Sequence, residues 1–150
     1  MRAVVQRVES ASVTVDGVQV GAIGNGLLVL VAVQADDGPE DLEFTKKKLL
    51  NLRIFGDSEG RMNLSVRDVG GGILLVSQFT LFGDCRKGNR PSFTRSAAPE
   101  LAQALYLQLA DALEKEDVPV RTGQFQAMMK VSSVNDGPVT VIVDSRRAFY

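Results

Sequence analysis

The stretch Leu27-Leu28-Val29-Leu30-Val31-Ala32-Val33 decides the fold of this chain, because it is the longest uninterrupted apolar run in the sequence. Its seven residues fall far short of the ~20 that are needed to span a bilayer. A short apolar run bounded by turn residues is typical of a strand that is buried on both faces. We therefore expect residues 27–33 to form the central strand of a sheet, and nothing in the chain to cross a membrane.

The segments before this run predict antiparallel pairing. Residues 2–8 and 11–15 alternate between apolar and polar side chains enough to form strands. Asp16-Gly17 lies between two β-prone runs that extend from Val13 to Val20, which is a strong signal for a two-residue hairpin. The chain is thus expected to open as antiparallel sheet.

Two helices are expected, each beginning at a proline. Pro39 follows acidic residues, and side chains that suit a buried face recur at helical spacing from Leu42 to Leu52. Pro99 begins the clearer helix, in which four leucines from Leu101 to Leu113 recur every four residues along one face. This second helix is expected to face the core.

Further strands are expected in the second half of the chain, and they fix the fold class. They are Ile73–Gln78, Val118–Thr122, Met128–Val134 and Val139–Val143. Many strands with two helices and no repeating βαβ unit predict an α/β domain of the α+β type. We expect residues 1–150 to form a single domain with a mixed, largely antiparallel sheet.

The composition excludes several kinds of chemistry, because the sequence has no histidine and a single cysteine, Cys85. Without histidine there is no usual general base for Ser-His or Cys-His catalysis and no ligand set for an ordinary zinc site. One cysteine cannot form an internal disulfide. We expect neither a metal nor another cofactor. Residues 1–7 lack the apolar stretch of a signal peptide, so a cytoplasmic location is expected.

The net charge of −1 gives no overall electrostatic footprint for nucleic acid. Two local runs are nevertheless basic. Arg86, Lys87, Arg90 and Arg95 lie within ten residues that contain no acid, and Lys46–Lys48 forms the second run. Each run on its own is typical of solvated surface.

Two short segments carry the functional argument. The first, Ser77-Gln78-Phe79-Thr80-Leu81, lies where the strand from Ile73 ends, a common place for side chains and freed backbone N–H groups to face a ligand. Taken alone, the hydroxyls of Ser77 and Thr80 are more typical of ordinary hydrogen-bonded groups than of nucleophiles. Phe79 is likewise more typical of a core residue than of a substrate platform.

The second segment, Asn135-Asp136-Gly137-Pro138-Val139-Thr140, places an Asp-Gly pair directly before a proline. It predicts either a hairpin turn with Pro138 at the first residue of a strand or a Gly137–Pro138 peptide bond that is held cis. Only proline makes a cis bond accessible, and ~5–6% of such bonds are cis in folded proteins. The residues alone leave both interpretations open.

Together the two segments resemble the paired signatures of the D-aminoacyl-tRNA deacylase family, a Ser-Gln-Phe-Thr strand end and an Asn-x-Gly-Pro-x-Thr turn. The resemblance spans nearly the whole chain in order. It also covers Met1–Val8, Leu52–Phe55, Met62–Ser65, Gly88–Phe93 and Thr122–Phe125. It departs at Gln126 and Met128, where many relatives carry glycine and aspartate.

The resemblance implies a barrel-like fold and a homodimer whose active sites lie at the subunit interface. It implies that Gly137–Pro138, in the cis form, is inserted from one subunit into the other's site, and that Arg7 braces this pair. Phe125 and Met129 are implied to line the pocket for the terminal adenosine of tRNA. The implied supporting residues are Asn135, Val139 and Thr140. The implied partner is tRNA, with neither DNA nor a membrane.

The implied substrate is an aminoacyl ester on the terminal ribose, an activated bond whose hydrolysis makes a modest chemical demand. Ser77, Gln78, Phe79 and Thr80 form the expected catalytic segment. We expect the N–H groups of Phe79 and Thr80 to stabilise the oxyanion, while the neighbouring ribose hydroxyl helps to activate water. Thr80 as a covalent nucleophile is the second hypothesis, and it requires an activating base.

Selection against L-amino acids is expected to come from a steric clash with Gly137–Pro138, because apolar side-chain contacts discriminate by only ~1–3 kcal/mol. Gly137 presents backbone without a Cβ, and Pro138 fixes the chain. Such a site accepts many D-amino acids and cannot exclude glycyl-tRNA. The expected activity is that of a carboxylic ester hydrolase that performs chiral proofreading in translation quality control.

Two rival functions stay open. One is a hydrolase or deaminase of a small free metabolite, because compact α/β oligomers host many such reactions. The other is a non-enzymatic RNA-binding module that uses the loop from Arg86 to Arg95 on phosphates. Under the deacylase hypothesis, the expected contacts to the tRNA acceptor end are Arg86, Lys87 and Arg90.

Overall fold

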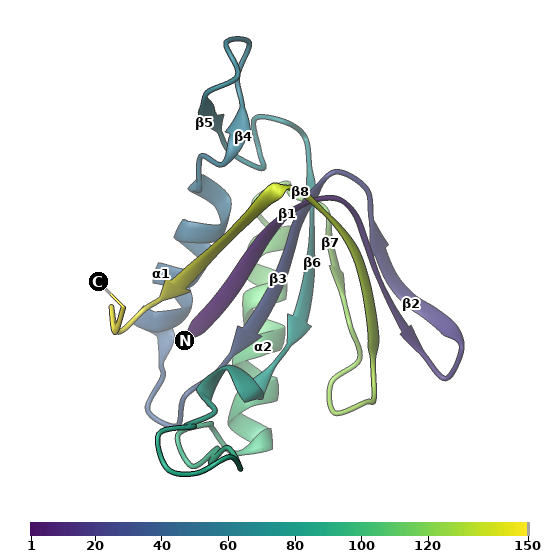
Figure 1. The fold of residues 1–150 in the computed structure, drawn as a ribbon. Coiled ribbons are helices and arrows are strands. Elements are labelled where there is room, and N and C mark those ends of the chain that lie inside the picture. The colour runs from purple at the N-terminus through teal and green to yellow at the C-terminus, as the bar shows by residue number, and fades with distance from the viewer. Residues whose placement is uncertain (150) are drawn as a thin grey trace.

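The sheet is built around β3, the strand that contains the long apolar run. The computed structural model describes residues 1–149, and its main sheet has six strands in the order β2-β1-β3-β6-β7, with β8 paired to β1 (Figure 1). These strands are β1 (Arg2–Val15), β2 (Val18–Ile23), β3 (Gly26–Ala32), β6 (Gly72–Ser77), β7 (Val120–Thr122) and β8 (Lys130–Asp144). A separate two-stranded sheet contains β4 (Phe55–Gly56) and β5 (Met62–Leu64). The β3–β6 and β6–β7 pairs are parallel and the other pairs antiparallel, which confirms a mixed, largely antiparallel sheet.

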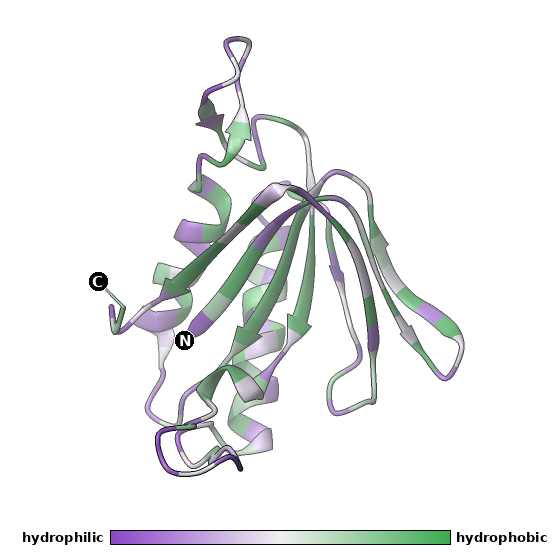
Figure 2. Ribbon diagram, viewed as in Figure 1, coloured by the Kyte–Doolittle hydropathy of each residue, from purple (hydrophilic) through white to green (hydrophobic). Residues whose placement is uncertain are grey.

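β3 is buried on both faces, as the apolar run predicts. Leu27, Val29 and Val31 belong to the core cluster that includes the helices, whereas Leu28 belongs to a second cluster. Successive side chains of a strand point to opposite faces of the sheet, so a strand between two clusters needs apolar residues at every position. Figure 2 shows the hydrophobic colour along the length of β3 and β6.

The two α-helices begin at the predicted prolines. They are α1 (Pro39–Asn51) and α2 (Pro99–Glu114), and a 3-10 turn, η1 (Phe79–Phe82), directly follows β6. Leu105, Leu109 and Leu113 of α2 are buried, which confirms the leucine face. No helix within residues 1–149 has the length and apolar character that crossing a membrane requires. The single α+β domain with a barrel-like sheet and two helices is therefore confirmed.

Two pairs of predicted strands are continuous in the structure. Residues 2–8 and 11–15 belong to one strand, β1, which pairs first with β3 and then with β2, while β8 runs along its other edge. The predicted strands 128–134 and 139–143 are likewise joined in β8, which begins only at Lys130, so Met128 and Met129 lie outside the strand. β7 is shorter than predicted because Pro119 has no N–H to donate, so the paired strand begins at the next residue.

The Asn135–Thr140 segment forms a bulge inside β8. The strand pairs on either side are Gln6 with Thr140 and Val8 with Asn135. Residues 136–139 therefore stand opposite Arg7 alone, and we call these four residues the Gly-Pro bulge. The peptide bond between Gly137 and Pro138 is cis. The hairpin interpretation is wrong, because β8 continues on both sides of the bulge.

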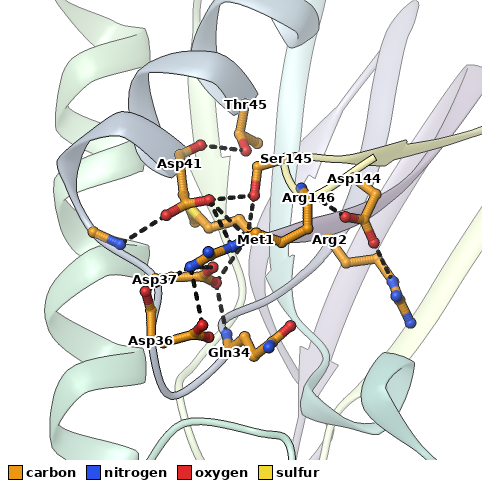
Figure 3. A network of polar contacts seen from close by, with 11 residues as sticks. Met1, Arg2, Gln34, Asp36, Asp37, Asp41, Thr45, Asp144, Ser145 and Arg146 are labelled. Atoms are coloured by element: carbon orange, nitrogen blue, oxygen red, sulfur yellow. Dashed lines mark hydrogen bonds and ion pairs between the residues drawn. The ribbon is translucent and has the colours of Figure 1, made fainter. Parts of the chain in front are cut away.

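A polar network fastens the start of β1 to α1 and to the end of β8 (Figure 3). The α-ammonium group of Met1 lies 2.7 Å from Oδ2 of Asp37 and donates to Oγ of Ser145 at 2.6 Å. The Ser145 hydroxyl in turn donates to Oδ1 of Asp41 at 2.6 Å. Because the ammonium and the Asp37 side chain are fully buried, removal of either charge takes from the other its nearest partner and leaves only Asp41 at 3.9 Å or Arg146 at 3.6 Å.

Candidate active site

A cleft of about 810 Å³ opens beside the carboxyl end of β6. Its walls come from the β6–η1 junction, the loop before α2, the first turn of α2 and the segment between β7 and β8. They include Val76–Thr80, Phe93, Ser96, Ala102 and Phe125–Met129. The predicted catalytic residues Ser77, Gln78, Phe79 and Thr80 therefore share one cleft with Phe125 and Met129.

The turn η1 provides two backbone N–H groups that no hydrogen bond of the turn uses. Gln78 donates its N–H to the carbonyl of Val31 at 2.7 Å, as a strand residue does. The first hydrogen bond of the turn runs from the Leu81 N–H to the Gln78 carbonyl at 3.1 Å. The N–H groups of Phe79 and Thr80 lie between these two bonds, like the first N–H groups of any helix. Donors of this kind suit a developing oxyanion.

Neighbouring groups hold Phe79 and Thr80 at the cleft. Phe79 is 55% exposed and meets Phe93 edge to face, with ring centroids 5.2 Å apart. Ser96 donates its hydroxyl to the Phe79 carbonyl at 3.1 Å. The side-chain amide of Gln78 donates to the Thr80 hydroxyl. Phe79 is therefore a wall of the cleft rather than the core residue that its type suggests.

The segment between β7 and β8 brings its own unusual backbone to the cleft. Gln126 has φ 59, in the left-handed region that favours glycine. Met128 is 90% exposed. Both line the cleft with Phe125 and Met129. Gln126 and Met128, where the resemblance is expected to break, thus line this cleft.

Tyr106 supports the cleft from α2 and was missed by the sequence analysis. Its hydroxyl donates to the Leu75 carbonyl at 2.8 Å, two residues before Ser77. Its ring lies against Phe125, with centroids 6.1 Å apart. Burial raises the pKa of Tyr106 to about 12. The one signal in the sequence is its place beside Leu105 on the leucine face, which predicts burial but no contact with the site.

The side chains of residues 1–149 that line the cleft include no charged group. The loop from Arg86 to Arg95, which we call the basic loop, contributes Phe93 to the cleft wall. Arg86 of this loop is already paired, since its Nη2 lies 2.6 Å from Oδ2 of Asp84. The Arg86 guanidinium holds the pKa of that carboxyl well below its usual range. Lys87 and Arg90 are exposed, and neither makes an ion pair within residues 1–149.

The Gly-Pro bulge lies at the other end of the molecule from this cleft. Figure 1 shows η1 at one end and the bend of β8 at the opposite end, next to β4. Arg7 connects the bulge to the residues just before β4. Its Nη1 donates to the Ile54 carbonyl at 2.6 Å, and its Nε donates to the Asp136 carbonyl at 3.1 Å. The structure therefore gathers Arg7 and the bulge, but it does not bring them to the cleft of the same chain.

The side chain of Asn135 forms hydrogen bonds that hold the two ends of the bulge together. Its Oδ1 accepts the Val139 N–H at 2.9 Å, and its Nδ2 donates to Oγ1 of Thr140 at 3.1 Å. Gly137 has φ 130, and a Cβ there would lie 2.7 Å from Cγ2 of Val139 and 3.0 Å from Nη2 of Arg7. Glycine is therefore the residue that fits, and the Gly137–Pro138 backbone stays exposed.

The fold and these two motifs define a class of protein. It is a single-domain α+β protein with a cleft at the carboxyl end of a parallel strand and an exposed glycine-proline motif at the far end of the same sheet. The family model described as D-Tyr-tRNA(Tyr) deacylase matches residues 4–144. The chain therefore belongs to the D-Tyr-tRNA(Tyr) deacylase family.

Individual relatives agree over nearly the full length. The D-aminoacyl-tRNA deacylase of Syntrophobacter fumaroxidans is 59% identical over 99% of this chain and 100% of the relative. That of Thermosipho africanus is 54% identical over the same shares. A solved structure described as c-Myc DNA Unwinding Element Binding Protein has a TM-score of 0.91 and 42% identity, and covers 96% of this chain and 98% of its own. A solved structure described as a probable eukaryotic D-amino acid tRNA deacylase shares the fold. Its TM-score is 0.79 at 23% identity, and the match covers 95% of this chain and 98% of its own.

Proposed function

We propose that the protein hydrolyses the ester bond between a D-amino acid and the terminal ribose of tRNA. Membership of the family and full-length similarity to D-aminoacyl-tRNA deacylases support this activity. The cleft supports it too, because it offers backbone N–H donors and aromatic surface without a charged side chain. An aminoacyl ester is already activated, so its hydrolysis does not need a strong base.

In the proposed reaction, water attacks the ester carbonyl while the N–H groups of Phe79 and Thr80 stabilise the oxyanion. One such donor lowers the barrier by about 2.7–4 kcal/mol, and positioning of water and ester contributes up to ~7–11 kcal/mol. The ribose hydroxyl next to the ester assists the water, because the side chains that line the cleft include no base. The bond from the carbonyl to the ribose oxygen then breaks, and that oxygen leaves with a proton.

Thr80 acts through its backbone in this proposal. Its hydroxyl accepts a hydrogen bond from the amide of Gln78, and an amide cannot activate a hydroxyl by removing its proton. Thr80→Ala is therefore expected to keep near-normal turnover of D-aminoacyl-tRNA in a single-turnover assay. A loss of several orders of magnitude would contradict a role through the backbone alone, and release of tRNA before the amino acid would establish a covalent route.

We propose further that the protein is a homodimer in which the Gly-Pro bulge of each subunit enters the cleft of the other. The support is the separation of the two motifs, since one chain cannot offer both to one substrate (Figure 1). β8 is an outer strand of the described sheet, and its Val131 and Val134 are 39% and 52% exposed. An apolar outer strand suits association. Sedimentation equilibrium should give twice the chain mass of 16.2 kDa, and a fully active monomer would contradict the proposal.

The proposed chiral selection uses the exposed backbone of Gly137 and Pro138 as a wall. D- and L-aminoacyl esters differ only in the direction of two substituents, so a rigid wall at the α-carbon rejects one enantiomer by a clash. The wall leaves the side chain of the amino acid unread, which gives breadth across D-amino acids. Glycine has no side chain to clash, so glycyl-tRNA is expected to be hydrolysed as well.

The basic loop at the cleft is the proposed contact of the same subunit with the acceptor end. Lys87 and Arg90 carry this role, because both are exposed and unpaired within residues 1–149. Arg86 contributes less, since Asp84 already neutralises it. Replacement of Lys87 and Arg90 by Gln should raise the KM for tRNA substrates most strongly at low salt, and an unchanged KM would exclude them.

A further inference from the structure

The end of the molecule that carries the Gly-Pro bulge also carries a groove of about 390 Å³, lined by basic side chains. Its lining residues are Phe44, Lys47, Lys48, Asn51, Leu52 and Arg53, and we call it the basic groove. It lies over the last turns of α1 and the residues that follow, and α1 runs toward β4 in Figure 1. The groove therefore lies at the opposite end of the molecule from the cleft.

One side chain, Arg7, links the bulge to the residue that follows the groove in the chain. Arg7 donates to the carbonyl of Ile54, the residue after Arg53, at 2.6 Å. The same guanidinium donates to the carbonyl of Asp136, the first residue of the bulge, at 3.1 Å. Through Arg7 the bulge lies next to the residue that follows the groove, so a partner that takes in the bulge comes to the same end of the molecule as the groove.

Two of the three positive charges of the groove, those of Lys47 and Lys48, make no ion pair within residues 1–149, whereas the third, Arg53, donates to Oδ1 of Asn63. Lys46, on the neighbouring side of α1, is held by Glu43 at 2.9 Å and by Glu116 at 3.4 Å. By contrast, Lys47 and Lys48 are exposed, and neither makes an ion pair within residues 1–149. Lys48 rests 5.6 Å from the centre of the Phe44 ring, which gives the groove an apolar floor and a cationic rim. An anionic polymer such as an RNA backbone complements this surface.

We propose that the basic groove binds phosphates of the tRNA whose terminal ester lies in the other subunit's cleft. The inference rests on the proposed function, in which the bulge of one subunit reaches the ester in the cleft of its partner. Because the groove accompanies the bulge, its lysines meet the nucleotides that lead out of that cleft. Each tRNA is then held by both subunits, on one side by the loop with Lys87 and Arg90 and on the other by the groove.

The first test compares Lys47→Gln/Lys48→Gln with Lys115→Gln/Arg147→Gln, a control that removes two exposed positive charges elsewhere. With D-aminoacyl-tRNA, the groove variant should raise KM about 10-fold at 0.1 M salt and reduce the slope of log KM against log salt by about 1.4–1.8, as expected for two lost phosphate contacts. kcat, and hydrolysis of a D-aminoacyl ester of adenosine alone, should not change. Equal KM values for groove variant and control overturn the proposal, as does an equal loss on the adenosine ester. Absence of hydrolysis by the wild type would instead refute the proposed function.

The second test asks which subunit supplies the lysines. Heterodimers are made in which one subunit has its cleft filled by Ala102→Trp, so that a single cleft works. Lys47→Gln/Lys48→Gln is then placed either in the filled subunit or in the open one. KM should rise only when the filled subunit carries the change. A rise only when the open subunit carries it, or no rise in either case, overturns the proposal.

Discussion

Replacement of Arg7 by Ala is the sharpest perturbation of the Gly-Pro bulge that leaves the cleft untouched. The side chain is 15% exposed and donates to the carbonyls of Ile54 and Asp136 at 2.6 and 3.1 Å. A hydrogen bond from a charged group contributes about 1.5–3 kcal/mol, so two bonds set a ceiling of about 3–6 kcal/mol. The Asp136 carboxylate is 58% exposed, and its ion pair with Arg7 adds at most about 1 kcal/mol. Water can solvate the freed Asp136 carbonyl, so we expect Arg7→Ala to lower the free energy of unfolding by about 2–4 kcal/mol.

The assay is urea denaturation at one fixed protomer concentration, because a dimer's stability depends on concentration. The rate of D-aminoacyl-tRNA hydrolysis is measured in parallel, and a shift of the bulge by about 1 Å should lower it on the order of 100-fold. Arg7→Lys, which can reach one carbonyl at most, should give intermediate values for both. Wild-type stability together with a wild-type rate for Arg7→Ala would refute the role given to this side chain.

Three further predictions address the bulge, the support behind the cleft and the N-terminal network. Gly137→Ala places a Cβ 2.7 Å from Val139 at a residue whose φ is 130. The hydrolysis rate on D-aminoacyl-tRNA should therefore fall by at least about 10-fold, and backbone strain should lower the free energy of unfolding by about 1–3 kcal/mol. A wild-type rate would count against the role of Gly137–Pro138 as a wall. Burial raises the pKa of Tyr106 to about 12, so the stabilising contribution of its hydroxyl is complete below pH 10 and is lost as the pH rises through 12. The difference in free energy of unfolding between wild type and Tyr106→Phe should therefore shrink between pH 10 and pH 12. A constant difference would contradict this prediction. Asp37→Asn leaves the buried Met1 ammonium without its nearest carboxylate. The free energy of unfolding, measured by urea denaturation, should therefore fall by about 3–5 kcal/mol. A fall below about 1 kcal/mol would show that Asp41 and Ser145 are enough to stabilise the ammonium.

The parts of the fold that depend on local chemistry could be predicted from the sequence. The run from Leu27 to Val33 is short, apolar at every position and preceded by a glycine-rich turn, as a strand that is buried on both faces requires. Asp16 and Gly17 both have positive φ in the hairpin turn, as their residue types predict. Pro39 and Pro99 mark helix starts because their missing N–H is not needed there.

The rest depends on contacts between residues that are distant in the chain. The bulge exists because Asn135 and Thr140 both keep their register with β1 while the residues between them do not. The sequence shows a Gly-Pro pair, but it does not show Arg7 opposite that pair, nor the hydroxyl of Tyr106 on the carbonyl of Leu75. The family resemblance, rather than residue spacing, suggested that Arg7 and Gly137–Pro138 work together.

The spacing of residues in the sequence also could not predict that the two signatures lie at opposite ends of the folded molecule. Both segments end or interrupt strands of the same sheet, and strand length and direction decide at which end each comes to lie. β6 ends at Ser77 beside η1, whereas the pairing of β8 with β1 is interrupted next to β4. This separation is the observation that makes a second subunit necessary in the proposed function.

The most direct test of the account is to incubate the purified protein with matched D-Tyr-tRNA, L-Tyr-tRNA and Gly-tRNA, with a chelator present, and to follow release of the amino acid. We expect rapid release from the D and glycyl substrates, with the L substrate spared by at least about 100-fold, as a steric clash of a few kcal/mol requires. Equal hydrolysis of D- and L-Tyr-tRNA would contradict selection by the Gly137–Pro138 wall, and hydrolysis of none would contradict the proposed activity itself.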